Sequence, residues 1–310
     1  MQRADLDRCI VNLRSTHNGN GPPWIAVYGD SLSRGMFFDT VQALNSSAQD
    51  LSAPTDAHPG HSANYSTDCT HYESRPPTHR LKCGAFCFDY LRSPTPPPAR
   101  VPRPFPPAND ACPAPSAALE GSSVAARLSF RLKTFTWEPA YDEPWLAAFA
   151  AARRLPDVVL LSFGIWDMQY PPHDDPWRGL DAFRTALHTF SASLEHTLQQ
   201  YRRRPQLYWL TVPAVSYDRL PVWKRPRMNA SLSRRYNEIA TPVMQGLGAV
   251  VIDTFSSGLA HPEHSRDGVH ATGALLAHHT RLFWRALCAG SDESRSLRRA
   301  LRKERRATDA

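Results

Sequence analysis

Residues 24–34 read WIAVYGDSLSR and decide the fold at the amino-terminal end of the chain. The first five of them, residues 24–28, are all apolar or aromatic, which is typical of a buried β-strand. A Gly-Asp-Ser turn follows, and in residues 33–44 the apolar side chains fall mostly on one side of a helix. The stretch therefore predicts a strand, a turn and a helix, the unit from which α/β proteins with parallel sheets are built.

The same alternation of short apolar runs and longer amphipathic stretches continues to residue 287. Residues 158–163 are apolar apart from Ser162, as in a central parallel strand, whereas residues 128–137 alternate as in a half-exposed strand. The pattern predicts a single α/β domain over residues 1–290 with a mainly parallel sheet. Further strands are predicted at residues 128–137, 158–163, 207–212 and 249–252, and further helices at residues 143–154, 180–203, 231–245 and 272–287.

Residues 46–121 interrupt this pattern. They show little periodicity, and the proline-rich residues 93–117 favour loop or polyproline II over helix or sheet. The interpretation is an insertion without a core of its own. Four of the six cysteines lie within it, and disulfides are favoured over a zinc site formed with nearby histidines, because the spacing fits no known structural zinc site. A bridge between Cys9 and Cys288, near opposite ends of the chain, is a further hypothesis. The four cysteines are Cys69, Cys83, Cys87 and Cys112.

Charge and composition limit the function classes. The 310 residues carry a formal charge of +7, and 42% of them are hydrophobic, enough for a core. The tail at residues 291–310 has seven basic and four acidic residues, which accounts for 7 − 4 = +3 of the charge. No nucleic-acid-binding signature accompanies it, so we expect a solvated tail and no nucleic-acid partner.

The sequence also bears on where the protein resides. No apolar run is long enough to span a membrane, and the first twenty residues lack the apolar centre of a signal peptide. Six cysteines and glycosylation sequons at Asn45, Asn64 and Asn229 suit an oxidising compartment. We expect the secretory pathway, Golgi lumen or extracellular, if an upstream signal is missing from this sequence, and the cytoplasm otherwise.

The Gly-Asp-Ser turn is a candidate catalytic position. Ligands of open α/β sheets bind at the carboxyl ends of the strands, where Ser31 would project its hydroxyl over a helix N-terminus. The alternative is that Ser31 or Ser33 caps the helix. A second segment, Asp267-Gly268-Val269-His270, stands before the last predicted helix. Because an imidazole activates a serine and a carboxylate orients the imidazole, the two segments together favour a Ser31, His270 and Asp267 triad.

These segments resemble sequence blocks of a known family. GDSLSR after the first strand and DGVH before the last helix are similar to the first and last blocks of the SGNH (GDSL-like) hydrolases. FGIWD at residues 163–167 resembles the middle block of the PC-esterase branch, which includes the trichome-birefringence-like polysaccharide O-acetyltransferases. The resemblance brackets nearly the whole chain but excludes the proline-rich insertion. It implies a three-layer α/β/α sandwich with a flavodoxin-like sheet of about five strands and no cofactor or metal.

The resemblance also implies roles for individual residues. Ser31 would be the nucleophile, His270 the general base and then acid, and Asp267 its orienting partner. Oxyanion donors would come from the backbone N–H of Ser31, from Gly164 and from Arg34, which could instead hold Asp30. Trp166 stands where other SGNH hydrolases have an asparagine, and a second glycine donor has no counterpart here. Trp166 could line the substrate pocket and Asp167 could receive loop N–H groups, with core packing an equal alternative for both.

We therefore expect a serine-dependent acyl esterase or O-acyltransferase that moves an acyl group, most simply acetyl, to or from a carbohydrate hydroxyl through an acyl-enzyme. Its partners would be a small-molecule or polysaccharide acyl ester and a sugar acceptor. The alternative is a non-catalytic glycan-binding or scaffold protein that retains the fold without the asparagine.

Overall fold

The computed structural model describes residues 9–10, 13, 23–45, 87–92, 126–151, 155–171 and 176–289. The strands in these ranges are β1 (Trp24–Gly29), β2 (Cys87–Arg92), β3 (Ala126–Leu132), β4 (Val158–Ser162), β5 (Gln206–Leu210) and β6 (Val250–Ile252). The helices are α2 (Ser31–Asn45), α4 (Pro139–Ala151), α5 (Ile165–Gln169), α6 (Pro176–Gln199), α7 (Ala230–Gly246), α8 (Phe255–Ala260) and α9 (Gly273–Ala289), with short 3-10 turns at Tyr217–Arg219 and Pro262–His264.

The strands form one six-stranded sheet in the order β2-β3-β1-β4-β5-β6. All neighbours pair in parallel except β2, which runs antiparallel to β3 at the edge. Without β2, the parallel strands have the order 2-1-3-4-5 along the chain, which is the flavodoxin-like topology. The direction of winding reverses at β1, so the carboxyl end of β1 is the topological switch point, where ligands of such sheets bind. The α/β prediction is confirmed.

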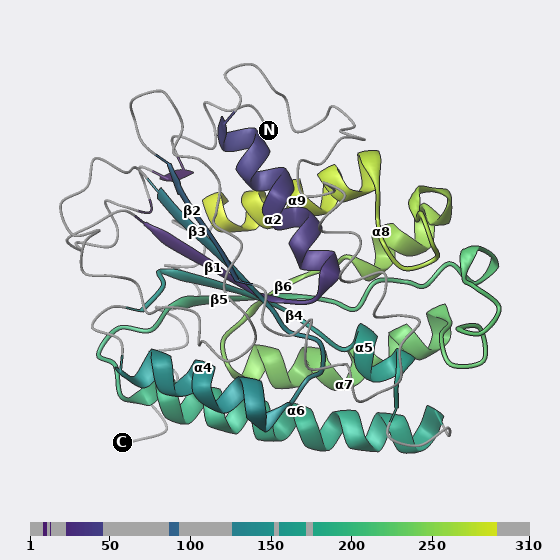
Figure 1. Ribbon diagram of the computed structural model, residues 1–310, viewed down its shortest axis with the longest axis horizontal. Helices are drawn as coiled ribbons and strands as arrows, with labels where there is room; N and C mark the ends of the chain where they lie inside the picture. The colour runs from purple at the N-terminus through teal and green to yellow at the C-terminus, as the bar shows by residue number, and fades with distance from the viewer. Residues whose placement is uncertain are drawn as a thin grey trace, which may run out of the picture.

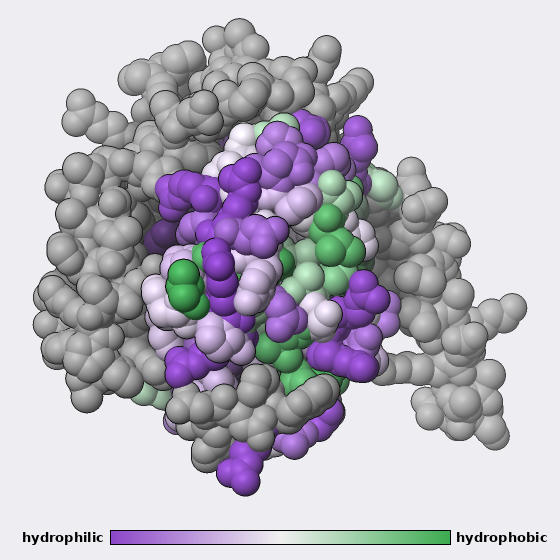
Figure 2. All heavy atoms as spheres, turned by 90° about the vertical axis from the view of Figure 1, so that its right-hand side faces the viewer, coloured by the Kyte–Doolittle hydropathy of each residue, from purple (hydrophilic) through white to green (hydrophobic). Residues whose placement is uncertain are grey.

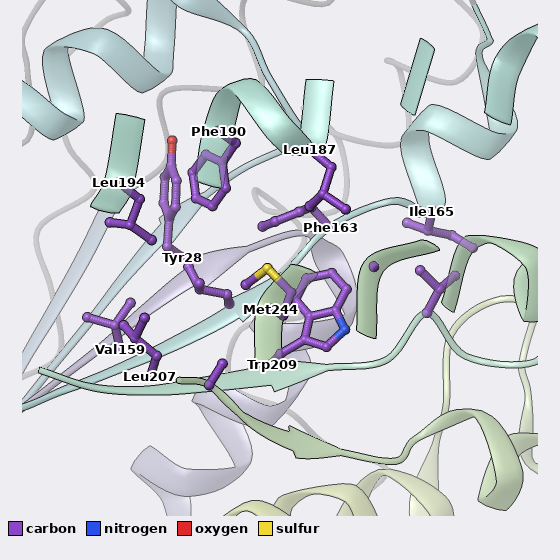
Figure 3. Close-up of a cluster of buried hydrophobic side chains, with 14 of the residues drawn as sticks. Tyr28, Val159, Phe163, Ile165, Leu187, Phe190, Leu194, Leu207, Trp209 and Met244 are labelled. Atoms are coloured by element: carbon purple, nitrogen blue, oxygen red, sulfur yellow. The ribbon is translucent and has the colours of Figure 1, made fainter. Parts of the chain in front are cut away.

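Helices cover both faces of the sheet (Figure 1), with α2 and α9 on one side and α4, α6 and α7 on the other. The period of two in each strand divides the side chains between two apolar clusters. In β1, Ile25 and Val27 join the cluster beneath α2 and α9. Trp24, Ala26 and Tyr28 join the cluster on the opposite face, part of which Figure 3 shows. Since both faces are buried, a uniformly apolar strand is what this position requires.

Strand β3 ends earlier than the alternation in residues 128–137 predicts. The backbone N–H of Lys133 still donates to the carbonyl of Gly29 at 2.8 Å, and the chain then leaves the sheet. Two carboxylates hold the departing segment. Asp167 accepts the N–H of Thr136, and Asp142 accepts the N–H of Glu138 at 2.6 Å. The prediction of a strand up to residue 137 is therefore wrong for residues 133–137, because side chains replace the strand pairing.

The segment 46–121 contains a strand that the sequence interpretation missed. Residues Cys87–Arg92 form β2, which extends the sheet beside β3. The prediction of loop or polyproline II is therefore wrong for these six residues. The remainder of the segment, the pairing of Cys69, Cys83, Cys87 and Cys112, and the tail at residues 291–310 lie outside what the structure describes. The single domain, its insertion and its tail stay predictions.

The two ends of the domain are tied together. Cys9 and Cys288, 279 residues apart, form a disulfide with their Cα atoms separated by 5.2 Å. Both cysteines contribute to the cluster beneath α2 and α9, together with Ile10 and Leu13. The hypothesis of a bridge between Cys9 and Cys288 is therefore confirmed. None of the helices in the described ranges is long and apolar enough to cross a membrane.

Candidate active site

The turn after β1 is shaped by Asp30, which is 1% exposed. Its carboxylate accepts the backbone N–H of Leu32 at 3.0 Å and the hydroxyl of Ser162 at 3.3 Å. Asp30 therefore caps helix α2 at its N-terminus, a position that asparagine and aspartate favour. Ser33 is fully buried, and its hydroxyl donates to the Asp30 carbonyl. Asp30, and not Ser31 or Ser33, therefore caps the helix. The hydroxyl of Ser31, the first residue of the helix, can bind another partner.

That partner is His270. Ser31 Oγ lies 2.7 Å from His270 Nε2, although the two residues are 239 positions apart in the chain. His270 Nδ1 lies 2.8 Å from Asp267 Oδ2. The three side chains thus form one continuous hydrogen-bonded line from hydroxyl to imidazole to carboxylate. This is the arrangement in which a serine can transfer its proton to a neighbouring base.

The loop that carries Asp267 and His270 is closely fixed. Asp267 Oδ1 accepts the backbone N–H of both Val269 and His270, at 3.1 and 2.9 Å. Gly268 adopts a φ of 84°, the left-handed region that glycine tolerates best. A Cβ there would lie 2.7 Å from the Ser216 carbonyl oxygen, so the position excludes larger residues for two separate reasons. The three-residue spacing of Asp267 and His270 therefore produces one rigid turn.

The pKa values of Asp267 and Asp30 are shifted in opposite directions. Burial alone would raise the pKa of Asp267. The hydrogen bond and charge of His270, with the N–H groups of His270 and Val269, instead hold this pKa well below its ordinary value. Asp267 is therefore ionised at neutral pH, and because a carboxylate can only accept, Nδ1 of His270 donates to it. In the neutral imidazole, Nε2 then faces Ser31 as an acceptor. Burial raises the pKa of Asp30 from 3.8 to about 6, despite the opposing N–H of Leu32 and the nearby His270.

The predicted middle block lies just after β4. Gly164 has a φ of 109° and precedes α5, and a Cβ on it would lie 2.9 Å from Val212 Cγ2. Trp166 is half-buried, packs against both apolar clusters and meets the ring of Phe135 edge-on at 6.3 Å. Packing therefore accounts for both residues. Their proposed roles in the oxyanion hole and the substrate pocket stay predictions.

The carboxylate of Asp167 accepts hydrogen bonds from a loop, which is one of the two interpretations of this residue from sequence. Its carboxylate accepts the N–H of Thr136 at 3.0 Å and the Thr136 hydroxyl at 2.9 Å. Burial raises its pKa to about 6, against these hydrogen bonds and the charge of Lys133. Asp167 thus fastens the segment after β3 to the segment after β4, and both segments leave the carboxyl edge of the sheet.

Arg34 lies half-buried in the first turn of α2, and its backbone N–H donates to the Asp30 carbonyl at 3.1 Å. It is therefore one helical turn from Ser31, as the sequence predicts. Whether its side chain serves the oxyanion or Asp30 stays a prediction. The sequence also contains three successive residues that resemble a metal cluster in type but that we expect to form a solvated turn, His173, Asp174 and Asp175, and they lie outside the described residues. Within the described ranges, no group of three or more histidine, cysteine, aspartate or glutamate side chains could hold a metal ion.

A buried ion pair behind the site was not anticipated from sequence. Lys133 Nζ lies 2.5 Å from Asp142 Oδ1, with both side chains almost fully enclosed. The Tyr28 hydroxyl donates to the same carboxylate at 2.6 Å, and the Lys133 ammonium sits 4.6 Å from the Phe190 ring centre. Burial lowers the pKa of Lys133 although Asp142 opposes the shift. The only signal in the sequence was a lysine and an aspartate nine residues apart, which indicates nothing by itself.

Comparisons with known proteins find similarity to solved structures only. No known protein family and no curated protein matches it. Three solved structures are similar to it. A lipase/acylhydrolase from Enterococcus faecalis is 12% identical over 86% of this chain and 96% of its own, with a TM-score of 0.39. A putative GDSL-like lipase from Parabacteroides merdae is 12% identical over 88% and 98%, with a TM-score of 0.44. An acetylxylan esterase from Geobacillus stearothermophilus is 12% identical over 86% and 95%, with a TM-score of 0.41. The activities in these names are those of the named proteins.

Proposed function

We propose that this chain is a serine-dependent acyl esterase or O-acyltransferase of the SGNH type, in which Ser31 is the nucleophile, His270 the general base and Asp267 its orienting partner. The observation that carries the proposal is the hydrogen-bonded line from Ser31 Oγ through both nitrogens of His270 to Asp267, at 2.7 and 2.8 Å. Its place at the switch point of the sheet supports the assignment, because substrates of such folds bind there.

The reaction would proceed in two steps. Ser31 Oγ bonds to the carbonyl carbon of an acyl ester while its proton passes to His270 Nε2, and the imidazolium that forms is stabilised by ionised Asp267. The tetrahedral intermediate then expels the alcohol, which takes the proton from His270, and an acyl-serine remains. In the second step, water or a sugar hydroxyl loses a proton to His270 and attacks the acyl carbon. His270 then returns this proton to Ser31 Oγ as the bond between Oγ and the acyl carbon breaks.

The oxyanion of the intermediate needs donors that are already in position. Ser31 is the first residue of α2, a 15-residue helix, so its backbone N–H is one of the N-terminal groups that have no acceptor within the helix, where the helix dipole favours negative charge. Arg34 and Gly164 remain the proposed additional donors. Each such donor is typically worth about 3 kcal/mol of barrier.

The proposed substrate is an acyl ester of a carbohydrate, most simply an acetyl ester, as the resemblance to the PC-esterase branch implies. Hydrolysis and transfer use the same acyl-enzyme and differ in whether water or a bound sugar reaches it. The Cys9–Cys288 disulfide supports our placement of the protein in an oxidising compartment such as the secretory pathway, because disulfides are rare in the cytosol.

A serine-directed fluorophosphonate tests the nucleophile. We expect the wild-type chain and a Ser33→Ala control to be labelled, because the Ser33 hydroxyl is committed to the Asp30 carbonyl. Ser31→Ala should not be labelled, and His270→Ala should be labelled far more slowly. An unlabelled wild-type protein, or equal labelling of Ser31→Ala, would leave the non-catalytic glycan-binding alternative as the better explanation.

The reaction itself is tested with an acetyl ester, with and without sugar acceptors, by following acetate and acetylated sugar by mass. Release of acetate alone would identify an esterase, and acetylated sugar a transferase. We expect Ser31→Ala and His270→Ala each to lower turnover by at least about a thousandfold with the fold intact.

A further inference from the structure

The exposed apolar side chains are concentrated beside the proposed site. Across the described residues, five large hydrophobic side chains are exposed, and three of them lie between positions 217 and 223. They are Tyr217 at 50%, Val222 at 75% and Trp223 at 47% exposure. Scattered exposed hydrophobic residues are ordinary on a protein surface, but a cluster of this kind marks an interaction surface. We refer to residues 216–228, which follow β5, as the rim loop.

The rim loop is held in one conformation by its own buried residues. Leu220, Lys224 and Met228 are each at most 2% exposed. Arg225 donates from Nε to the Leu220 carbonyl and from Nη2 to the Asp218 carbonyl, both at 3.1 Å. The exposed rings are therefore carried on a fixed support, so little conformational entropy would be lost when a ligand binds.

The rim loop also contacts the segment that holds Asp267 and His270. The backbone N–H of Ser216 donates to the Gly268 carbonyl at 2.8 Å, and Arg219 Nη1 donates to the Ser265 carbonyl at 3.1 Å. Gly268 lies so close that a Cβ on it would approach the Leu220 nitrogen to 2.8 Å. A molecule that rests on the rim loop therefore lies next to the proposed catalytic turn.

The accessible charge of the rim loop is positive. Between residues 217 and 227, three arginines and one aspartate are exposed or half-buried, so their net charge is 3 − 1 = +2, whereas Lys224 is buried. Cations and rings alternate, because Arg225 lies over the Tyr217 ring at 5.5 Å and Lys224 over the Trp223 ring at 5.1 Å. Exposed Arg266 adds a further cation beside Asp267. Figure 2 shows the side of the molecule on which the carboxyl ends of the strands lie. Hydrophilic and hydrophobic residues are interspersed there.

We propose that the rim loop binds an acidic polysaccharide, and that the ester attacked by Ser31 is carried on such a polymer. This rests on the function proposed above and specifies its substrate class. The apolar face of a pyranose ring can pack on Tyr217 and Trp223, while carboxylate or sulfate groups pair with the arginine side chains. A lipid surface fits less well, because Tyr217 and Trp223 are each only about half exposed and Val222 alone is mostly exposed, whereas interfacial binding needs a broad apolar face.

Binding is measured in the full-length Ser31→Ala chain, so that no turnover is involved, using polygalacturonate and the neutral polymer dextran. We expect polygalacturonate to bind and dextran not to bind. Tyr217→Ala and Trp223→Ala should each raise the apparent Kd by about tenfold. Arg266→Gln should weaken binding, and its effect should shrink as salt screens the charges.

The controls are Val250→Ala, another exposed apolar side chain, at the start of β6, and Arg184→Gln on α6, whose arginine pairs with Asp181. Neither should change the Kd, and melting temperatures show that every variant is folded. Equal affinity for dextran, or unchanged affinity in the two ring variants, would overturn the proposal. Loss of binding to anionic phospholipid vesicles in the same variants, with no binding of polygalacturonate, would replace it with a lipid surface. Because Ser31 is already absent, any of these outcomes is distinguishable from failure of the fluorophosphonate test.

Discussion

Replacing Asp30 with asparagine should remove a pH-dependent cost from the stability of the protein. Asp30 is 1% exposed, and its Oδ1 accepts the N–H of Leu32 and the hydroxyl of Ser162. Asparagine keeps an oxygen for these two hydrogen bonds and caps helices as well as aspartate does. The substitution therefore changes the charge and leaves the contacts of the turn largely intact.

The magnitude follows from the shift in pKa. Burial raises the pKa of Asp30 from 3.8 to about 6 in the folded protein. Below pH 3.8, Asp30 is protonated in both the folded and the unfolded protein. Between pH 3.8 and about 6 only the folded protein keeps this proton, so the free energy of unfolding falls as pH rises. At about 1.4 kcal/mol per pKa unit the total loss is about 3 kcal/mol, most of it between about pH 4 and pH 7. The asparagine variant lacks this loss.

Urea unfolding across this pH range measures the difference. We expect the Asp30→Asn variant to match the wild type in stability near the low end and to exceed it by about 3 kcal/mol at neutral pH. Other groups also titrate, such as buried His279, whose pKa burial lowers to about 4, but they are common to both proteins and cancel. Asp181→Asn is the control, because Asp181 lies exposed on α6. A difference between wild type and Asp30→Asn that does not change with pH would refute the reasoning.

Further predictions concern the catalytic turn and the disulfide. Asp267→Asn should lower turnover of an acetyl ester by about ten-thousandfold, because the amide cannot stabilise the imidazolium; a loss below about tenfold would contradict the triad. Gly268→Ala should lower the free energy of unfolding by at least about 2 kcal/mol and reduce turnover, since strain and overlap combine. Gly248→Ala, also at positive φ but in open space, should cost only about 1 kcal/mol, and an equal cost at both positions would contradict the packing argument. Cys9→Ser should lower the free energy of unfolding by about 5 kcal/mol from loop entropy alone, and an unchanged urea midpoint would exclude that contribution.

The parallel strands could be predicted because their environment leaves one solution. A strand between two helical layers must be apolar on both faces, and residues 158–161 and 207–210 show that pattern, with Ser162 as the polar last residue of β4. Strand β2 could not be predicted in the same way. It lies at the sheet edge and directly precedes the proline-rich residues, and its pairing is supplied by β3, more than thirty residues later in the chain.

The end of β3 at Leu132 could not be predicted from the sequence for a related reason. Apolar and polar residues alternate again over residues 135–137, so local periodicity extends the strand to Trp137, although the successive polar residues Lys133 and Thr134 shift the apolar positions by one. What ends it is a set of tertiary contacts, from Thr136 to Asp167 and from Lys133 to Asp142. A carboxylate thirty-one residues away outweighs strand propensity, and only the folded chain reveals which carboxylate that is.

The candidate site could be predicted in its residue types, and the packing of two helices explains why those residues meet. Ser31 begins α2 and His270 directly precedes α9, and the contacts between these helices run in the same order along both. Gly35 faces Leu276, where a Cβ would lie 3.2 Å from the leucine Cδ1.

Further along the same helices, the Trp284 indole donates to the Thr40 hydroxyl at 3.1 Å. The helices are therefore parallel on one face of the sheet, with both N-termini at the carboxyl edge. A side chain larger than glycine at position 35 would require the end of the Leu276 side chain to move by a few tenths of an ångström. The glycine one turn after the nucleophile thus lets α2 and α9 pack closely near Ser31 and His270, which the motif alone does not indicate.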